Sequence, residues 1–295
     1  MRIKLSLLIV LAMCVMAHAA DVPTAVVADP PADKANPARM AYLRIPSHGV
    51  LMNGLLYTAA GAGVHPAVVL FHGFPGNEQN LDLAQAIRRA GFDVMTLHYR
   101  GAWGSPGAFS FSHAIEDADA AVTFLRNPAT ASKYAIDPKR IFVAGHSMGG
   151  FMAASAATHE PAVAGLVMIS AWDIGVDGAT FKNPAVRKGV LRGEFADDVI
   201  PLAGTTPDRL LDEAAAHASQ WEFVGFAPRL RTRPVLLIGA DDGLYPSSQR
   251  LGAALRQTGD VDVTEIHVAT DHAYSDHRIA LESAVVSWLT RHSRQ

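Results

Sequence analysis

The sequence predicts an α/β fold in which a mostly parallel sheet is covered by helices on both faces. Short apolar runs recur along the chain and alternate with segments whose apolar residues have helical spacing. The runs are almost continuous in Val, Ile and Leu, which is typical of strands that are buried on both faces. About 255 residues follow the N-terminal region, enough for one large core without a second domain.

The first nineteen residues have the pattern of a secretory signal peptide. Arg2 and Lys4 precede an apolar run over 5–15, and Ala17-His18-Ala19 offers a small-x-small cleavage site. We therefore expect a periplasmic or secreted protein without stable membrane insertion once the signal is removed; a lipoprotein anchored at Cys14 is the alternative. Cleavage after Ala19 leaves no cysteine, and hence no disulfide.

Residues 20–40 are rich in Pro, Ala and Asp without an apolar period, so we expect a flexible tether there. Residues 41–295 then form the single predicted domain. The formal net charge of −3 becomes −5 when the leader takes Arg2 and Lys4 with it. A mildly acidic chain without a basic patch is not expected to bind nucleic acid.

The predicted elements of the first half begin with an antiparallel pair. We expect strands at 43–45, 51–57, 67–71 and 93–99, with a helix through Leu83, Ile87 and Ala90 that ends at Gly91. Ser112 is a candidate N-cap for a helix that Pro128 ends.

The predicted elements of the second half alternate regularly. We expect strands at 141–144, 163–170, 234–239 and 261–268, and helices after Ser147, from Gln249, and over 278–291. Between 171 and 232 lie about 60 residues, whereas a simple crossover needs only about a dozen. Long loops in compact domains are usually functional, so we expect a helical cap over the site at about 172–232, with a structural excursion as the alternative.

The chain is organised around Gly145-His146-Ser147-Met148-Gly149. A buried strand precedes this motif and a helix-forming run follows it, so Ser147 is placed on a sharp strand–helix turn. The flanking glycines leave room for the neighbouring backbone. Ser147 is therefore the predicted nucleophile, and the N–H of Met148, near a helix N-terminus, is a predicted oxyanion donor.

A serine nucleophile needs a base and an acid that orients the base. Asp242 follows the strand at 234–239, and His272 follows the strand at 261–268, so both side chains are expected at the carboxyl edge of the sheet. Asp242 is preferred to Asp241, for which we expect a structural role in the turn. His277 and His267 are weaker alternatives to His272, because one begins a helix and the other lies within a strand.

The second oxyanion donor is expected in His72-Gly73-Phe74-Pro75-Gly76, the loop after the first parallel strand. The N–H of Phe74 is the predicted donor, since proline has none. We interpret His72 and His146 as hydrogen-bonding neighbours of the site. Arg100 is a candidate for binding a substrate anion, although an internal salt bridge is the commoner use of such a residue.

These motifs resemble the α/β-hydrolase superfamily over almost the whole predicted domain. The resemblance is carried by His72-Gly73, Tyr99-Arg100-Gly101, residues 136–141, Gly145–Gly150, and the two segments Gly239–Asp242 and Asp271-His272. The chain is most similar to the group that contains dienelactone hydrolases, acetyl-xylan esterases and the catalytic domains of prolyl oligopeptidases. In that group the acid is the third residue after a strand-ending glycine, which also implies Asp242.

The sequence therefore predicts a serine hydrolase that cleaves carboxylic esters of short to medium acyl chain through an acyl-enzyme. Its expected partner is a small ester or amide. An aminopeptidase or amidase, and an acyltransferase with the same triad, are the alternatives, and a non-catalytic binding protein is disfavoured by the intact set of Ser, Asp and His. No cofactor and no metal are expected, because no phosphate-binding loop and no His-Glu-x-x-His motif is present.

Overall fold

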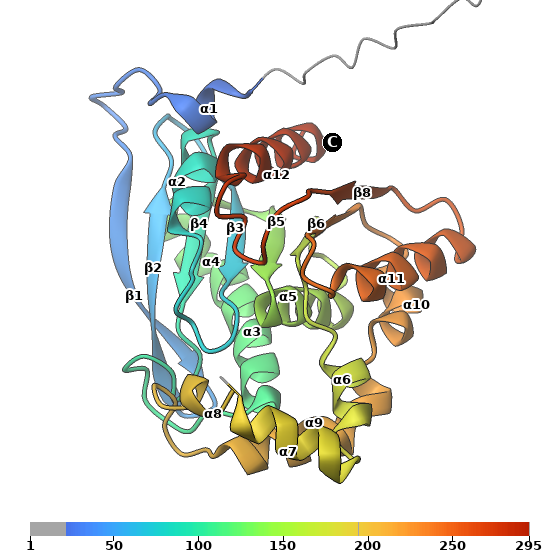
Figure 1. Ribbon diagram of the computed structural model, residues 1–295. Coiled ribbons are helices and arrows are strands. Elements are labelled where there is room, and N and C mark those ends of the chain that lie inside the picture. The colour runs from blue at the N-terminus through green and yellow to red at the C-terminus, as the bar shows by residue number, and fades with distance from the viewer. Residues whose placement is uncertain (1–21, 194, 295) are drawn as a thin grey trace, which may run out of the picture.

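The computed structural model describes residues 22–193 and 195–294, and the predicted signal peptide with Cys14 lies outside them. One sheet of eight strands has the order β1-β2-β4-β3-β5-β6-β7-β8 (Figure 1). The pairs β1–β2 and β2–β4 are antiparallel and all the others are parallel. The strands are β1 Arg39–Ser47, β2 Val50–Thr58, β3 His65–Phe71, β4 Asp93–Leu97, β5 Ile136–His146, β6 Gly165–Ile169, β7 Val235–Gly239 and β8 Val263–His267.

Helices cover both faces of this sheet, which confirms the predicted fold class. One face carries α3 Phe111–Arg126, α4 Pro128–Tyr134, α5 Met148–His159 and α11 Tyr245–Gln257. The other face carries α1 Thr24–Val27, α2 Leu81–Arg89 and α12 Arg278–His292. The strands between them are buried on both faces because the parallel crossovers place a helical layer on each side.

Two predicted helix starts differ from those observed. The N-cap of α3 is Ser110, whose hydroxyl accepts a hydrogen bond from the His113 N–H at 3.1 Å, so the assignment to Ser112 was wrong by two residues. The helix expected from Gln249 begins at Tyr245, with Pro246 in its first turn. Proline is tolerated there because the first N–H groups of a helix have no acceptor within it.

We expected residues 20–40 to form a flexible tether, but part of this segment is helical and packs on the core. Residues Thr24–Val27 form one helical turn against α2 and α12, and Val26 is buried. Arg89 holds this turn by donating to the Ala25 carbonyl at 2.5 Å and to the Val26 carbonyl at 3.2 Å. One apolar side chain and one arginine hold the segment in place. Two such residues are too few to produce a recognisable apolar periodicity in the sequence.

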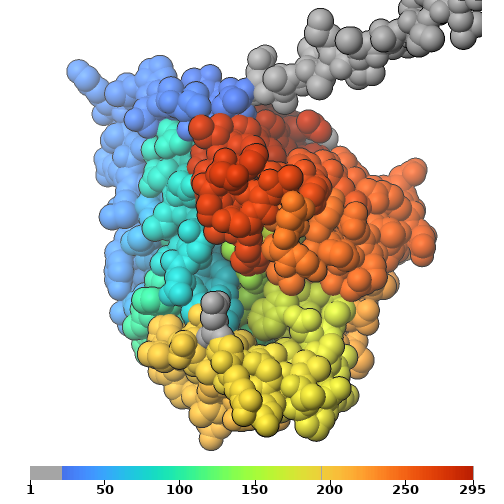
Figure 2. Space-filling view, viewed as in Figure 1, coloured from blue at the N-terminus to red at the C-terminus, as the bar shows by residue number. Residues whose placement is uncertain are grey.

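The long segment between β6 and β7 is a helical insertion. It contains α6 Ile174–Thr180, α7 Pro184–Arg192, α8 Phe195–Asp198, α9 Pro207–Trp221, the 3₁₀ turn Phe223–Phe226 and α10 Ala227–Leu230. Most of it lies at the end of the molecule opposite α1 and α12 (Figure 1). In the space-filling view the insertion, in yellow, forms a continuous surface below the orange C-terminal elements (Figure 2).

The second half of the insertion is built into the core. Trp221, Phe223 and Phe226 surround the ring of Phe151 on α5, with ring centroids 5.8–6.1 Å apart. Glu213 on α9 caps a helix of the core, because its carboxylate accepts from the N–H groups of Phe111 and Ser112 at the start of α3, at 2.8 and 2.9 Å. A negative charge at a helix N-terminus stabilises that helix.

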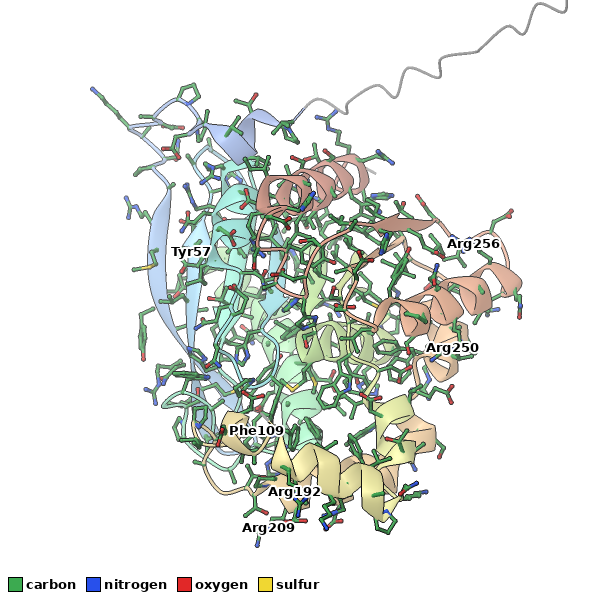
Figure 3. The ribbon with its side chains drawn as sticks, in the orientation of Figure 1. Tyr57, Phe109, Arg192, Arg209, Arg250 and Arg256 are labelled. Carbon is green, nitrogen blue, oxygen red and sulfur yellow. The ribbon has the colours of Figure 1, made fainter. Side chains whose placement is uncertain are left out.

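Helices α7 and α8, in the middle of the insertion, are attached less firmly. The loop after α8 joins the core through two backbone bonds, from Ala203 N–H to the Gly101 carbonyl at 2.7 Å and from Phe109 N–H to the Ala203 carbonyl at 2.9 Å. The side chain of Phe109 lies beside α8, while Arg192 and Arg209 lie lower, on α7 and α9 (Figure 3). Among the described residues of α7 and α8, none is fully buried.

No helix within residues 22–193 and 195–294 has the length and apolar character that crossing a membrane requires.

A buried carboxylate at the start of β4 makes stability depend on pH. Asp93 is fully buried; one oxygen accepts from the Ala59 N–H at 2.8 Å and the other has no partner among the described residues. Burial raises the pKa of Asp93 to about 6, against the smaller lowering effects of the Ala59 bond and of nearby His65. The folded protein therefore binds a proton more tightly there than the unfolded chain does, and this contribution to stability is lost as pH rises toward 6.

We expect Asp93→Asn to stabilise the fold at pH 8 by ~1–3 kcal/mol and to have little effect near pH 4, because asparagine keeps the acceptor without the buried charge. Urea unfolding at both pH values measures the difference, with the exposed Asp29→Asn as the matched control. An equal loss of stability at both pH values would contradict the argument.

Candidate active site

Ser147 stands on a strained turn between β5 and α5. Its backbone has φ 56° and ψ −123°, a conformation that L residues rarely adopt. The turn is possible because its neighbours are glycines: a Cβ on Gly145 would collide with the Gly149 backbone, and one on Gly149 with the Phe71 carbonyl. A Cβ on Gly150 would lie 2.5 Å from the Ala171 side chain. Any side chain at 145, 149 or 150 would therefore collide with its neighbours, as the sequence led us to expect for the residues around the serine.

Ser147 is half-exposed, whereas the other residues of 141–150 are buried. The N–H of Met148 is the first of helix α5 and has no acceptor within the helix. The loop after β3 passes directly beside the serine, because a Cβ on Gly73 would lie 3.0 Å from that of Ser147. Phe74 therefore lies close to the serine, and no hydrogen bond of the described chain engages its N–H.

His272 and Asp242 are paired at the carboxyl edge of the sheet. The Nδ1 atom of His272 lies 2.7 Å from Oδ2 of Asp242. The Asp242 side chain is 6% exposed and that of His272 is 41% exposed, so a buried acid holds a base that faces outward. The alternatives are occupied elsewhere, since Asp241 pairs with His267 at 2.9 Å and His277 pairs with Asp276 at 2.8 Å.

The carboxylate of Asp242 is supported by a hydroxyl network, in which the Ser170 hydroxyl bonds to Asp242 and also lies beside the Tyr274 hydroxyl. Burial raises the pKa of Asp242, but hydrogen bonds from His272, the Leu244 N–H and the Ser170 hydroxyl outweigh it, so the pKa lies below its usual value. The Ser170 hydroxyl also lies 3.0 Å from the Tyr274 hydroxyl, which is fully buried. Ser170 and Tyr274 both have positive φ, of 39° and 58°. Neither residue was predicted from the sequence, because no local sequence pattern indicates that two distant hydroxyl groups will be buried together.

Two further histidines lie at the site and are held neutral. Burial, together with the smaller effect of nearby His272, lowers the pKa of His146 to about 4. Nε2 of His146 lies 2.8 Å from the His272 carbonyl oxygen, so its ring positions the backbone of the base. Burial also lowers the pKa of His72 to about 4, and its Nδ1 lies 2.7 Å from the Gly73 carbonyl oxygen. Both rings are hydrogen-bonding neighbours, as the sequence indicated.

Aromatic side chains join the Phe74 loop to the insertion. The ring of Phe74 stacks on Phe195 of α8, with centroids 5.1 Å apart and an interplanar angle of 15°. Phe109, Phe111 and Trp172 lie around the same ring at 6.0–6.5 Å. The insertion therefore reaches the residue that carries the predicted oxyanion donor.

Arg100 is not available to a substrate. Its guanidinium is buried and binds Asp117 at 2.6 Å and Glu116 at 2.5 Å. The internal salt bridge weighed in the sequence analysis is the observed arrangement. No group of three or more His, Cys, Asp or Glu side chains within 22–193 and 195–294 is placed to hold a metal ion.

Comparisons of the sequence point to hydrolases. Residues 63–188 match the family model described as "Serine aminopeptidase, S33". A segment of 117 residues is 31% identical to an uncharacterised protein of Mycobacterium tuberculosis, found in two strains. That match covers 39% of this chain and 40% of the relative, so it spans less than half of either protein.

Comparisons of the structure point to the same fold. A bacterial brefeldin A esterase, described as a homologue of human hormone-sensitive lipase, is 19% identical with a TM-score of 0.65 over 94% of this chain and 87% of that one. A Pyrobaculum calidifontis esterase is 20% identical with a TM-score of 0.60, over 87% of each chain. An acylaminoacyl peptidase of Pyrococcus horikoshii is 18% identical with a TM-score of 0.61, over 85% of this chain and 41% of that one.

The sheet order, the strained serine after β5 and the structural comparisons show that the chain has the α/β-hydrolase fold. The match of residues 63–188 to the serine aminopeptidase model covers less than half of the chain, and it supports a serine hydrolase in general.

The hydroxyl network gives a test of how the acid is held. We expect Ser170→Ala to raise the pKa of Asp242, because the variant loses a hydrogen bond to the charged carboxylate. Tyr274→Phe keeps the Ser170 donor and should raise the pKa less. Carbon-13 NMR titration of the Asp242 carboxyl measures both shifts, and a larger effect of Tyr274→Phe would contradict this order of contacts.

Proposed function

We propose that this protein is a serine hydrolase of carboxylic esters with short to medium acyl chains. The single observation that carries the proposal is the placement of Ser147 at a strained, half-exposed turn on the sheet edge that also holds the His272–Asp242 pair. Nucleophile, base and orienting acid are the three parts that acyl transfer by a serine requires.

In the proposed reaction the Ser147 hydroxyl attacks the ester carbonyl while His272 takes its proton. Because Asp242 engages Nδ1 of His272, the other ring nitrogen, Nε2, is the one that takes this proton. His272 then donates the proton to the leaving alcohol, and an acyl-serine remains. Water, deprotonated by the same nitrogen, releases the acid.

The oxyanion of each tetrahedral intermediate is assigned to the N–H groups of Phe74 and Met148. Two observations support this assignment: Met148 begins helix α5 and adds its positive end, and Phe74 follows Gly73, whose Cβ position would lie 3.0 Å from that of Ser147. Removing one such donor typically costs ~10²–10³ in turnover, so the position of the Phe74 loop matters to the rate. Phe195 stacks on that loop, which makes α8 a candidate boundary of the acyl pocket.

Labelling with a fluorophosphonate tests the nucleophile. We expect one modified residue, Ser147, in peptide maps of the wild-type protein and none in Ser147→Ala. Asp242→Asn should keep the serine but slow labelling by a factor on the order of 10³–10⁴, because the imidazole loses its orienting charge. Asp241→Asn is the matched control and should label at the wild-type rate. Modification at another serine would refute the assignment.

A series of p-nitrophenyl esters tests the acyl preference. We expect activity to peak between acetyl and hexanoyl esters, since each buried methylene adds only ~0.8 kcal/mol while it still fits. Deleting the whole insertion would uncover Phe151, so a point variant is the sharper probe. Phe195→Ala should shift the preference toward longer chains, while Val186→Ala on exposed α7 should not. A peak at palmitoyl esters would overturn the proposed pocket.

A second candidate, an aminopeptidase or amidase, is favoured by the description of the matching family model. It would need carboxylates for the free amine of a peptide. Asp197 and Asp198 lie on α8, and Glu194, the third candidate, is outside the described residues. Comparing aminoacyl p-nitroanilides with p-nitrophenyl butyrate separates the two functions, and added alcohols would reveal acyl transfer. Fast anilide cleavage with weak ester cleavage would reverse our order.

The periplasmic or secreted location also remains a proposal, because it rests on residues 1–19 alone. Fractionation of the producing cells and N-terminal sequencing of the purified protein test it together.

A further inference from the structure

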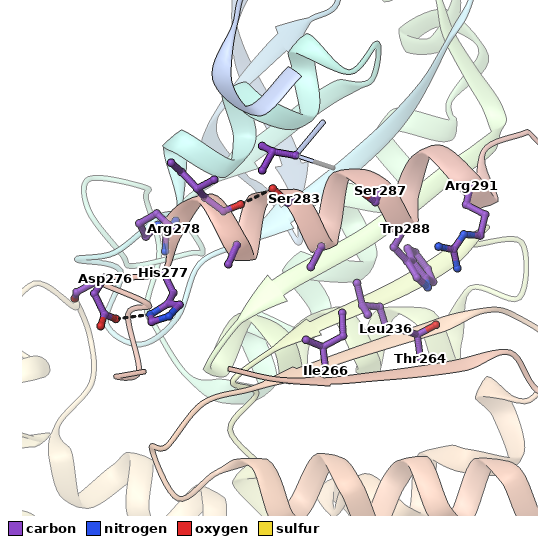
Figure 4. Close-up of a pocket in the computed structure, with 15 residues that line it drawn as sticks. Leu236, Thr264, Ile266, Asp276, His277, Arg278, Ser283, Ser287, Trp288 and Arg291 are labelled. Atoms are coloured by element: carbon purple, nitrogen blue, oxygen red, sulfur yellow. Dashed lines mark hydrogen bonds and ion pairs between the residues drawn. The ribbon is translucent and has the colours of Figure 1, made fainter. Parts of the chain in front are cut away.

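A groove of about 800 Å³ lies between helix α12 and the edge strand β8 (Figure 4). None of Ser147, Asp242 and His272 lines it, so it is a different place from the candidate active site. Cavities of about 300–1,000 Å³ are the usual size for sites that bury a small organic ligand.

The groove exists because small residues of α12 face the end of the sheet. Ala280 and Ala284 line it from the helix, and Leu236 of β7 and Ile266 of β8 line it from the sheet. Figure 4 shows Leu236 and Ile266 on the side of the strands that faces α12. The middle of the groove is therefore a mainly apolar channel along the helix, with Ser283 and Ser287 on its helix side.

One end of the channel carries hydrogen-bond donors without partners. Arg291 is exposed and forms no ion pair among the described residues. The indole N–H of Trp288 also has no acceptor in the described chain, but it is enclosed, since the residue is only 2% exposed. Thr264 adds a hydroxyl, and Figure 4 shows Trp288, Arg291 and Thr264 at the same end. A free cation beside a hydroxyl donor matches a carboxylate.

The other end of the channel offers no comparable group. Arg278 is engaged by Asp82 at 2.6 Å and by Asn80 at 3.0 Å, and His277 is paired with Asp276. Both ends of the groove are therefore polar, but among the described residues an unpaired charge lies at the Arg291 end only. This asymmetry is the chemistry of an amphipathic anion whose head is negative and whose tail is a hydrocarbon.

We propose that the groove between α12 and β8 binds a monocarboxylate with a medium to long alkyl chain. The carboxylate takes Arg291 and the Thr264 hydroxyl, and the chain lies along Ile266, Leu236 and Ala284. This site does not depend on the proposed ester hydrolysis, because none of its residues belongs to the triad.

Dodecanoate is the probe, and calorimetric titration of the full-length protein, with Ser147 blocked by a small fluorophosphonate, measures its binding. We expect one saturable site. Arg291→Gln should weaken it at least about tenfold, the loss expected for a hydrogen bond to a charged group. Arg294→Gln is the matched control three residues on and should leave binding unchanged. Ala284→Phe, which fills the channel without changing charge, should abolish binding.

Photo-crosslinking with a diazirine-bearing dodecanoate locates the ligand. We expect crosslinks on 263–267 and 278–291, displaced by dodecanoate better than by 1-dodecanol. Crosslinks confined to the peptides around Ser147 and the insertion would overturn the proposal, as would equal competition by acid and alcohol. Light scattering completes the test: a dimer that Ala284→Phe dissociates, without dodecanoate binding, would make the groove a contact between two copies of the chain instead.

Discussion

The close approach of helix α5 to strands β3 and β5 is the constraint on which the rest of the structure depends. Three glycines allow it, because a Cβ at 145, 149 or 150 would meet backbone or side-chain atoms already in place. The close approach holds Ser147 in a strained backbone conformation and places the N-terminus of α5 directly after it. It also sets the position of β6, since the Ser147 carbonyl accepts from the Trp172 N–H just beyond that strand. This one turn therefore contacts β3, β5 and the chain just beyond β6.

The residues brought to this edge were predictable because each follows a strand that the sequence marks clearly. Ser147, Asp242 and His272 come after the ends of β5, β7 and β8, and parallel strands present those ends together. Asp242 was preferred because a structural role was expected for Asp241, and the family resemblance agreed. In the structure the Asp242 side chain is 6% exposed and paired with His272, while Asp241 is exposed and paired with His267.

The supporting contacts were not predictable, because they join residues far apart in sequence without a local pattern. Glu213 caps a helix about a hundred residues away, and Ser170 meets Tyr274 across a similar separation. The predicted start of α3 was wrong for another reason. Ser110 and Ser112 are both suitable N-cap residues, and only the hydrogen bond from the His113 N–H to Ser110 distinguishes them. The docking of Thr24–Val27 depends on one valine and one arginine, too little for a composition argument.

The capping of α3 by Glu213 has a consequence for how the site is entered. Lifting the whole insertion would leave the start of that helix without its acceptor and would uncover Phe151, so opening by rigid removal of the insertion is energetically expensive. The part that α7 and α8 form has no fully buried residue among those described, and its contact with the site is one aromatic stack, Phe195 on Phe74. Any movement of α7 and α8 relative to the rest of the insertion would therefore separate Phe195 from Phe74, and would change the packing of the loop that carries the proposed oxyanion donor.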